Sequence, residues 1–221
     1  MTWDEFVVGW AGAYGGYDLR YAARSRRRLL AATYRVSRIL ARFGVRPASM
    51  MVLSVAFAVA VPVIALRGGA WPLAAAVCLL AGLGVDTLGF GLTVVTAGIT
   101  RLSGFYQSLV ERFSELCWLL ALACLGTKPW VVFTMAVLVW AHEYVKARVG
   151  APALRPTAAT TVGDRPTRVW AVLAALGLAA ATAQLGQDLA AGAVTLVVVS
   201  WLALALVGLA QLFSIIRKVL A

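Results

Sequence analysis

Long runs of apolar residues fill the chain from residue 48 onward, and short polar or glycine-containing breaks separate them. A helix needs about 20 apolar residues to cross a bilayer. Runs of about this length lie at residues 49–67, 71–97, 102–126, 129–147, 167–187 and 189–214. The pattern therefore predicts an all-α integral membrane protein whose residues 48–221 form a domain of six transmembrane helices.

A different pattern precedes these runs, because apolar residues recur there every three or four positions and arginines fill the opposite side. The apolar set is Leu29, Ala32, Val36, Ile39, Leu40 and Phe43, and the basic set is Arg28, Arg35, Arg38 and Arg42. This periodicity predicts a basic amphipathic helix along a membrane surface, ended by Gly44 and Pro47. We assign residues 1–47 to a cytoplasmic N-terminal segment. Its helix either anchors the N-terminal segment on the cytoplasmic side through its arginines or binds anionic lipid.

Composition and charge agree with a membrane location. The chain is 62% hydrophobic and 13% charged, whereas soluble domains are only about 45–50% apolar. With a cytoplasmic N-terminus, all but Arg67 and Lys128 of the 20 lysine and arginine residues lie on the cytoplasmic side, as the positive-inside rule requires. We therefore expect both termini to face the cytoplasm, in a bacterial cytoplasmic membrane. Because the net charge of +11 is placed at the ends of spans, nucleic acid is not an expected partner.

Acidic residues interrupt the second and third apolar runs. They are Asp86, Glu111 and Glu115, with Arg101 and Arg112 nearby. Ionised groups in apolar surroundings are unfavourable unless they face a polar cavity, a metal ion or one another. The two predicted spans are antiparallel, so Asp86 and Glu111 lie at similar depth below the cytoplasmic face. Since Gln107, Glu111 and Glu115 are four residues apart and share a helix face, we expect one pocket that opens to the cytoplasm.

The alternative explanation for these acids is structural. An ion pair of Glu111 or Glu115 with Arg101 or Arg112 would also satisfy buried charges and join two helices. Asp86 has no basic residue in its own predicted span, so this explanation accounts for Asp86 less well.

The stretch from Asp86 to Glu111 resembles the signature of the membrane CDP-alcohol phosphotransferases, Asp-x2-Asp-Gly-x2-Ala-Arg-x8-Gly-x3-Asp-x3-Asp. In this register Asp86 matches the first aspartate and Glu111 replaces the fourth, while Glu111-Arg112-x2-Glu115 is similar to the Asp-Arg-x2-Asp that often ends the signature. Other segments that resemble the family are Ala41 to Pro47, Glu143 to Arg148 and Asp164 to Arg168. The resemblance extends from about residue 29 to the C-terminus, and it implies a bundle of six transmembrane helices.

The resemblance also implies a function and a cofactor. In the family, four aspartates hold two divalent ions that bridge the diphosphate of a CDP-linked lipid, and one aspartate helps to deprotonate the attacking alcohol. By this resemblance Asp86 and Glu111 are the candidate catalytic residues. The candidate ligands for Mg²⁺ or Mn²⁺ are Asp86, Gln107, Glu111 and Glu115. The expected partners are membrane lipid, a diphosphate-linked lipid substrate and, by analogy with the family, a second copy in a homodimer.

The signature is degenerate in this chain. Gly89 and Gln107 stand in place of the second and third aspartates. The family's small or basic residues are replaced by Phe90, Thr93, Val94 and Ser103. Two-metal phosphoryl transfer needs enough carboxylate to hold both ions about 3.5–4 Å apart. The sequence therefore predicts a reduced site with one ion and weak binding of CDP-alcohols.

Basic residues near the cytoplasmic ends of the spans complete the candidate site. The candidates for binding a phosphate or an acceptor head group are Arg101, Arg112, His142, Lys146, Arg165 and Arg168. A lone histidine such as His142 is also typical of an interfacial residue, and the arginines equally fit the positive-inside rule. Asp164 followed by Pro166 is typical of the start of a helix.

Three functions stay open on the sequence alone. The first is a Mg²⁺-dependent transferase of phospholipid biosynthesis, which moves a phosphoryl-lipid group from a diphosphate-activated lipid to an alcohol. The second is a degenerate family member without catalysis, which binds lipid or supports a partner protein. The third is an enzyme that acts on another lipid diphosphate, such as a prenyl diphosphate. The enzymatic functions require a metal ion beside Asp86 and Glu111, and the second does not.

Overall fold

The computed structural model describes residues 1–13, 24–153 and 161–220, and within these ranges the chain is helical without strands. The elements are α1 (Trp3–Ala13), α2 (Arg24–Arg42), α3 (Pro47–Ala65), α4 (Trp71–Val95), α5 (Arg101–Cys124), α6 (Pro129–Ala153), α7 (Arg165–Thr182), the short 3₁₀ helix η2 (Ala183–Leu185) and α8 (Gln187–Leu220). The predicted all-α class is confirmed. Each of the helices α3 to α8 overlaps one predicted apolar run, and α6 and α8 extend further at their C-terminal ends than predicted.

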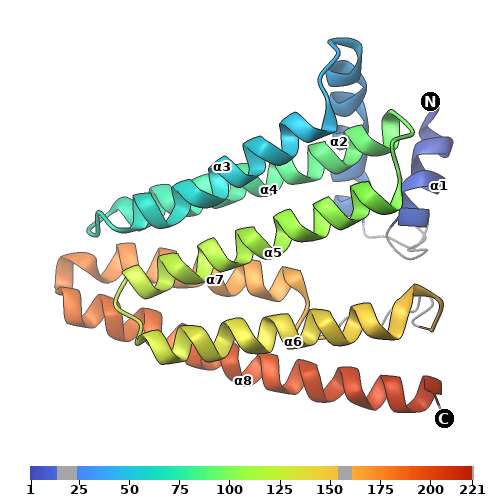
Figure 1. Cartoon of the computed structure of the whole chain (residues 1–221). Coiled ribbons are helices and arrows are strands. Elements are labelled where there is room, and N and C mark those ends of the chain that lie inside the picture. Colours follow the sequence, from blue (N-terminus) through green and yellow to red (C-terminus); the bar gives the residue numbers. More distant parts are fainter. Residues whose placement is uncertain (14–23, 154–160, 221) are drawn as a thin grey trace.

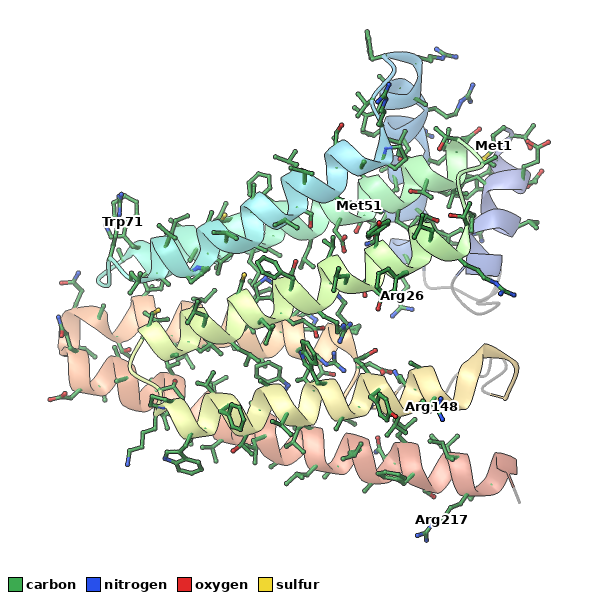
Figure 2. The ribbon with its side chains drawn as sticks, viewed as in Figure 1. Met1, Arg26, Met51, Trp71, Arg148 and Arg217 are labelled. Carbon is green, nitrogen blue, oxygen red and sulfur yellow. The ribbon has the colours of Figure 1, made fainter. Side chains whose placement is uncertain are left out.

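The helices α3 to α8 run alongside one another in an elongated bundle, and α2 crosses one end of it (Figure 1). Contacts join α3 to α4 and α5, α4 to α7, and α8 to both α6 and α7. Both chain termini lie at the end that α2 crosses, whereas the α3–α4, α5–α6 and α7–α8 turns lie at the other end. Figure 2 accordingly shows Trp71 at one end of the bundle, and Arg148 and Arg217 at the opposite end.

Among the described residues, four helices are long and apolar enough to cross a membrane: α3, α4, α7 with its η2 extension, and α8. They indicate an integral membrane protein. The helices α5 and α6 do not qualify by composition. The reason is that ionisable residues interrupt them, among them Glu111, Arg112 and Glu115 in α5, and Glu143 and Lys146 in α6. Length and composition therefore support four of the six predicted spans.

Glycines allow α4 to approach two other helices closely. A Cβ atom added to Gly82 or Gly89 would come within 3.0 Å of an α3 side chain, and one added to Gly91 would lie 2.6 Å from the Oγ of Ser37 in α2. Gly84 has open space around it. Small residues at such positions let helix backbones pack tightly. The close contacts fix the segment of α4 that carries Asp86.

Two apolar clusters stabilise the fold. The larger one lies toward the end of the bundle that holds the α3–α4, α5–α6 and α7–α8 turns. Its fully buried residues include Val61, Leu79, Leu122, Val172 and Val194. The smaller cluster joins α1, α2 and α4 through Phe6, Trp10, Leu30, Tyr34 and Val94. Outside these two clusters, the bundle buries the charged residues Asp86, Glu115 and Arg168.

Candidate functional site

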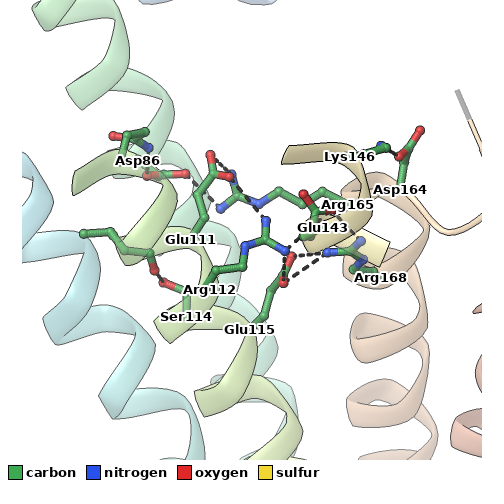
Figure 3. Close-up of polar contacts among 12 residues, drawn as sticks. Asp86, Glu111, Arg112, Ser114, Glu115, Glu143, Lys146, Asp164, Arg165 and Arg168 are labelled. Carbon is green, nitrogen blue, oxygen red and sulfur yellow. Dashed lines mark hydrogen bonds and ion pairs between the residues drawn. The ribbon is translucent and has the colours of Figure 1, made fainter. Parts of the chain in front are cut away.

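A polar cluster lies inside the bundle, where α4, α5, α6 and the start of α7 face one another (Figure 3). It contains five of the nine acidic residues of the chain, namely Asp86, Glu111, Glu115, Glu143 and Asp164. Its cationic residues are Arg112, Lys146, Arg165 and Arg168. We call these nine residues the acid–arginine cluster. Every acid in the cluster forms an ion pair with at least one of its cations. The charges therefore nearly cancel within the cluster.

Arg165, the first residue of α7, joins the two candidate catalytic acids. Its Nη2 lies 2.9 Å from Oδ2 of Asp86, and its Nη1 lies 2.7 Å from Oε1 of Glu111. The guanidinium group therefore lies between the two carboxylates (Figure 3). Gln107 completes this arrangement, because its Nε2 donates a hydrogen bond of 2.6 Å to Oδ1 of Asp86. Charge-assisted hydrogen bonds of this kind are among the strongest in proteins.

Arg168 is the most deeply buried member of the cluster, with 1% of its side chain exposed. Its Nη1 lies 3.0 Å from Oε1 of Glu115, and its Nη2 lies 2.6 Å from Oε1 of Glu143. Its Nε donates to the carbonyl oxygen of Gly163 at 2.9 Å. Arg112 binds the other oxygen of Glu115 at 2.7 Å. Glu115 is thus paired with arginines from two helices, which is the condition under which buried charges are tolerated.

His142 and Lys146 connect α6 to the segment before α7. The Nδ1 of His142 lies 3.3 Å from Nη2 of Arg168, and its Nε2 lies 2.9 Å from Oγ1 of Thr161. Lys146 forms an ion pair with Asp164. Asp164 also accepts a 2.8 Å hydrogen bond from the backbone nitrogen of Thr161.

The spacing along each helix explains why these partners meet. Arg165 and Arg168 are three residues apart in α7, and Glu111 and Glu115 are four residues apart in α5, so each pair occupies one helix face on successive turns. Arg165 consequently pairs with Glu111, and Arg168 pairs with Glu115, one turn along the bundle. The start of α7 at Asp164 with a proline in the first turn is confirmed, but the Asp164 side chain makes no capping hydrogen bond to the helix. Its carboxylate binds Lys146 and Thr161 instead.

Most of the predicted site residues meet in the structure. The cluster and its immediate partners include Asp86, Gln107, Glu111, Arg112, Glu115, His142, Lys146, Arg165 and Arg168. Arg101 is exposed in the first turn of α5, about 15 Å along the helix from Glu111, and it lies apart from them. Sequence reasoning left Glu143 and Asp164 out of the site. Their adjacency to His142 and Arg165 was the available signal.

The oxygen atoms that a metal ion would need are already paired in the cluster. Among the described residues, no group of three or more His, Cys, Asp or Glu side chains is arranged to hold a metal ion. Oxygens of Asp86 and Glu111 already face Arg165, and Gln107 presents its amide nitrogen, not the predicted oxygen, to Asp86. This donor set does not fit a pair of divalent ions, which need several free carboxylate oxygens. The single-ion site stays a prediction.

A small cavity borders the cluster. Its volume is about 10 Å³, and its lining includes Ser54, Gly82, Asp86, Ser114 and Arg165. A space of this size holds about one water molecule. The cavity is therefore far smaller than a nucleotide.

Fold and site together define an integral membrane protein, helical over the described residues, with a nearly neutral cluster of acids and arginines inside the bundle. Comparison with known proteins adds no family to this description, because no family model and no curated protein sequence matches the chain.

Proposed function

We propose that the chain is a non-catalytic, lipid-binding membrane protein of the CDP-alcohol phosphotransferase type, in which the acid–arginine cluster holds four helices together. The observation that carries this proposal is the position of Arg165, whose guanidinium contacts Asp86 at 2.9 Å and Glu111 at 2.7 Å. In the family that the sequence resembles, the corresponding acids bind divalent ions. Arginine is a permanent cation with a planar array of donors that matches carboxylates, so Arg165 pairs with both acids without a metal.

Two neighbouring positions in α4 support the same conclusion. Gly89 stands in place of the second signature aspartate, and a Cβ atom there would lie 2.9 Å from the Cβ of Met50 in α3. A carboxylate at this position would therefore displace α3. Phe90 stands in place of the signature glycine, and its ring packs edge-on against Trp10 of α1 at a centroid distance of 4.7 Å. Aromatic side chains thus fill the side where nucleotide binding would be expected by resemblance.

We further propose that all of the helices α3 to α8 span the membrane. Ionisable residues inside a membrane are tolerated when they face the interior of a bundle, and those of α5 and α6 pair with α7 in the cluster. The opposite side of α5 carries exposed apolar residues, including Leu109, Phe113 and Leu120. In this topology both termini face the cytoplasm, as the distribution of basic residues predicts.

Cysteine labelling tests this topology. Lys128→Cys, at an exposed position of the α5–α6 turn, and Arg148→Cys, near the end of α6, are each introduced into a variant without native cysteines. We expect a membrane-impermeant maleimide to label the two positions from opposite sides of sealed membranes. Labelling from the same side would contradict six spans.

A second candidate function is a transferase with one Mg²⁺ or Mn²⁺ ion, acting on a CDP-linked lipid or another lipid diphosphate. It is favoured by the fact that one guanidinium contacts both Asp86 and Glu111, since this places the two carboxylates on opposite sides of a space that a single cation fills. In this candidate Arg165 leaves the acids when the ion binds and pairs with a substrate phosphate.

A turnover assay separates the two candidates. Purified full-length chain in mixed micelles receives CDP-diacylglycerol, Mg²⁺ or Mn²⁺ and a panel of alcohols, and CMP release is measured for the wild type and Asp86→Ala. The proposal predicts the same background release in both, with phospholipid retained by both in native mass spectrometry. Metal-dependent release that Asp86→Ala abolishes would establish the transferase instead.

A further inference from the structure

The helix α2 has three different faces along its length. One face is buried against the rest of the protein and contains Leu30, Thr33, Tyr34 and Ser37. A second face carries the exposed apolar residues Leu29, Val36, Ile39 and Phe43. The third carries the exposed arginines Arg28, Arg35, Arg38 and Arg42. At 3.6 residues per turn, the arginine face directly adjoins the exposed apolar face.

The buried face fixes the rotation of α2. The Oγ of Ser37 donates to the carbonyl oxygen of Leu88 in α4 at 3.3 Å, and the hydroxyl of Tyr34 donates to the carbonyl oxygen of Met1 at 2.9 Å. Gly91 of α4 packs so closely that a Cβ atom there would lie 2.6 Å from the Oγ of Ser37. These contacts hold the apolar face outward, where Phe43 is 81% exposed. Contiguous exposed apolar residues rimmed by polar ones mark an interaction surface.

Orientation and charge indicate what covers this surface. Because α2 crosses the end of the bundle (Figure 1), it lies along the membrane surface when α3 to α8 span the bilayer. Residues 19–85 contain no aspartate or glutamate, so no acidic side chain within α2 offsets its arginines. A helix with an apolar face beside a basic face binds at the lipid interface, and its basic residues are attracted to anionic lipids.

We infer that α2 is a docking surface for anionic phospholipid of the cytoplasmic leaflet. Leu29, Val36, Ile39 and Phe43 enter the boundary between head groups and acyl chains, and the arginines beside them pair with lipid phosphates. Arg38 also supports the fold, because its Nη1 lies 3.2 Å from the hydroxyl of Tyr34. The inference deepens the proposed lipid binding by naming its site and lipid class, and it rests on membrane association but not on the absence of catalysis.

Lipid retention by the full-length chain tests the inference. The protein is equilibrated in detergent with equal amounts of phosphatidylglycerol and phosphatidylcholine, and bound lipid is counted by native mass spectrometry. The variant Arg28→Gln/Arg35→Gln/Arg42→Gln is compared with Arg148→Gln/Arg217→Gln/Lys218→Gln, which removes the same charge from exposed positions at the same end of the bundle. Each basic residue near an anionic surface is worth about a fivefold change in binding, and salt reduces this.

We expect the wild type to prefer phosphatidylglycerol, the α2 variant to lose at least about tenfold of this preference, and the control variant to stay within about twofold of the wild type. Equal losses in the two variants would show that only net charge matters, and an unchanged preference in the α2 variant would leave α2 as a topology signal. Either result overturns the inference, as does a wild type without preference. The turnover assay above does not depend on these residues, so the two proposals fail separately.

Membrane depth gives a second readout for the apolar face. Spin labels at Val36→Cys on the apolar face and Arg42→Cys on the arginine face are compared in vesicles that contain phosphatidylglycerol, again without native cysteines. The label at residue 36 should be accessible to oxygen and protected from a water-soluble nickel chelate, and the label at residue 42 should show the reverse. Equal exposure of both labels to the chelate would contradict docking.

Discussion

The two ends of the bundle interior are stabilised in different ways. Toward the α3–α4 turn the helices meet through aliphatic residues such as Val61, Leu79 and Leu122. Toward the cytoplasmic end of the proposed topology, they meet through the acid–arginine cluster. Loss of one apolar side chain leaves a gap that its neighbours partly fill. Loss of one charged partner leaves a buried charge without compensation. Single residues of the cluster should therefore matter more than single residues of the apolar end.

The largest effect is expected at Arg168. Arg168→Ala removes one of the two arginine partners of Glu115 and of Glu143 from a site where Arg168 is 1% exposed, and breaking a buried ion pair in this way costs about 3–5 kcal/mol. The measurement is the free energy of unfolding in mixed micelles of detergent and denaturing surfactant. Arg217→Ala, at an exposed position of α8, is the control and should have little effect. Equal stability of the two variants would show that the cluster does not hold the helices together.

A smaller effect is expected at the apolar end. Leu122 is fully buried, whereas Leu120 on the same helix is 54% exposed. Leu122→Ala should destabilise the chain by about 2–3 kcal/mol, the lower part of the range for such cavities, because lipid already provides an apolar environment for the unfolded helix. Leu120→Ala should change stability by less than about 0.5 kcal/mol. A larger loss of stability in Leu122→Ala than in Arg168→Ala would contradict the expectation that single residues of the cluster matter more than those of the apolar end.

The smallest effects on stability are expected at two glycines of α4, Gly89 and Gly84. Gly89→Ala brings a Cβ atom to 2.9 Å from Met50, and Gly84→Ala meets no atom within 4 Å. We expect Gly89→Ala to destabilise by about 1 kcal/mol or more through overpacking, and Gly84→Ala to stabilise by up to about 1 kcal/mol through helix propensity. The same unfolding measurement applies. Stabilisation by both substitutions would mean that α3 does not pack closely at Gly89.

The sequence was sufficient to predict the helices, but not to predict which side chains of different helices form ion pairs. Long apolar runs with glycine or proline at the breaks have few alternatives to helices, so α3 to α8 were predictable from local pattern. The pairing of Arg165 with Asp86 joins residues that are 79 positions apart, and it depends on which helix faces meet. The arginines of α7 could be explained by membrane topology alone, so nothing local assigned them to the acids.

The helix α2 shows the same limit. Its apolar periodicity predicted one apolar face and one basic face, and the structure adds a third face that binds α4 and α1 through Leu30, Thr33, Tyr34 and Ser37. Thr33 and Ser37 are small and polar, so the pattern of hydrophobic residues does not predict that they are buried. Close contact with Gly91 explains why small side chains occur there.

The central claim, that Arg165 and not a metal ion pairs with Asp86 and Glu111, is tested most directly by Mn²⁺ titration. Bound Mn²⁺ is followed by electron paramagnetic resonance in the wild type, Asp86→Ala and Arg165→Gln, and the midpoint of thermal unfolding is recorded for each with and without the ion. We predict no specific Mn²⁺ site in the wild type, the same Mn²⁺ response in Asp86→Ala, and new binding with stabilisation in Arg165→Gln, because that variant leaves two carboxylates facing one another. Specific Mn²⁺ binding by the wild type that Asp86→Ala abolishes would contradict the claim and establish the metal site.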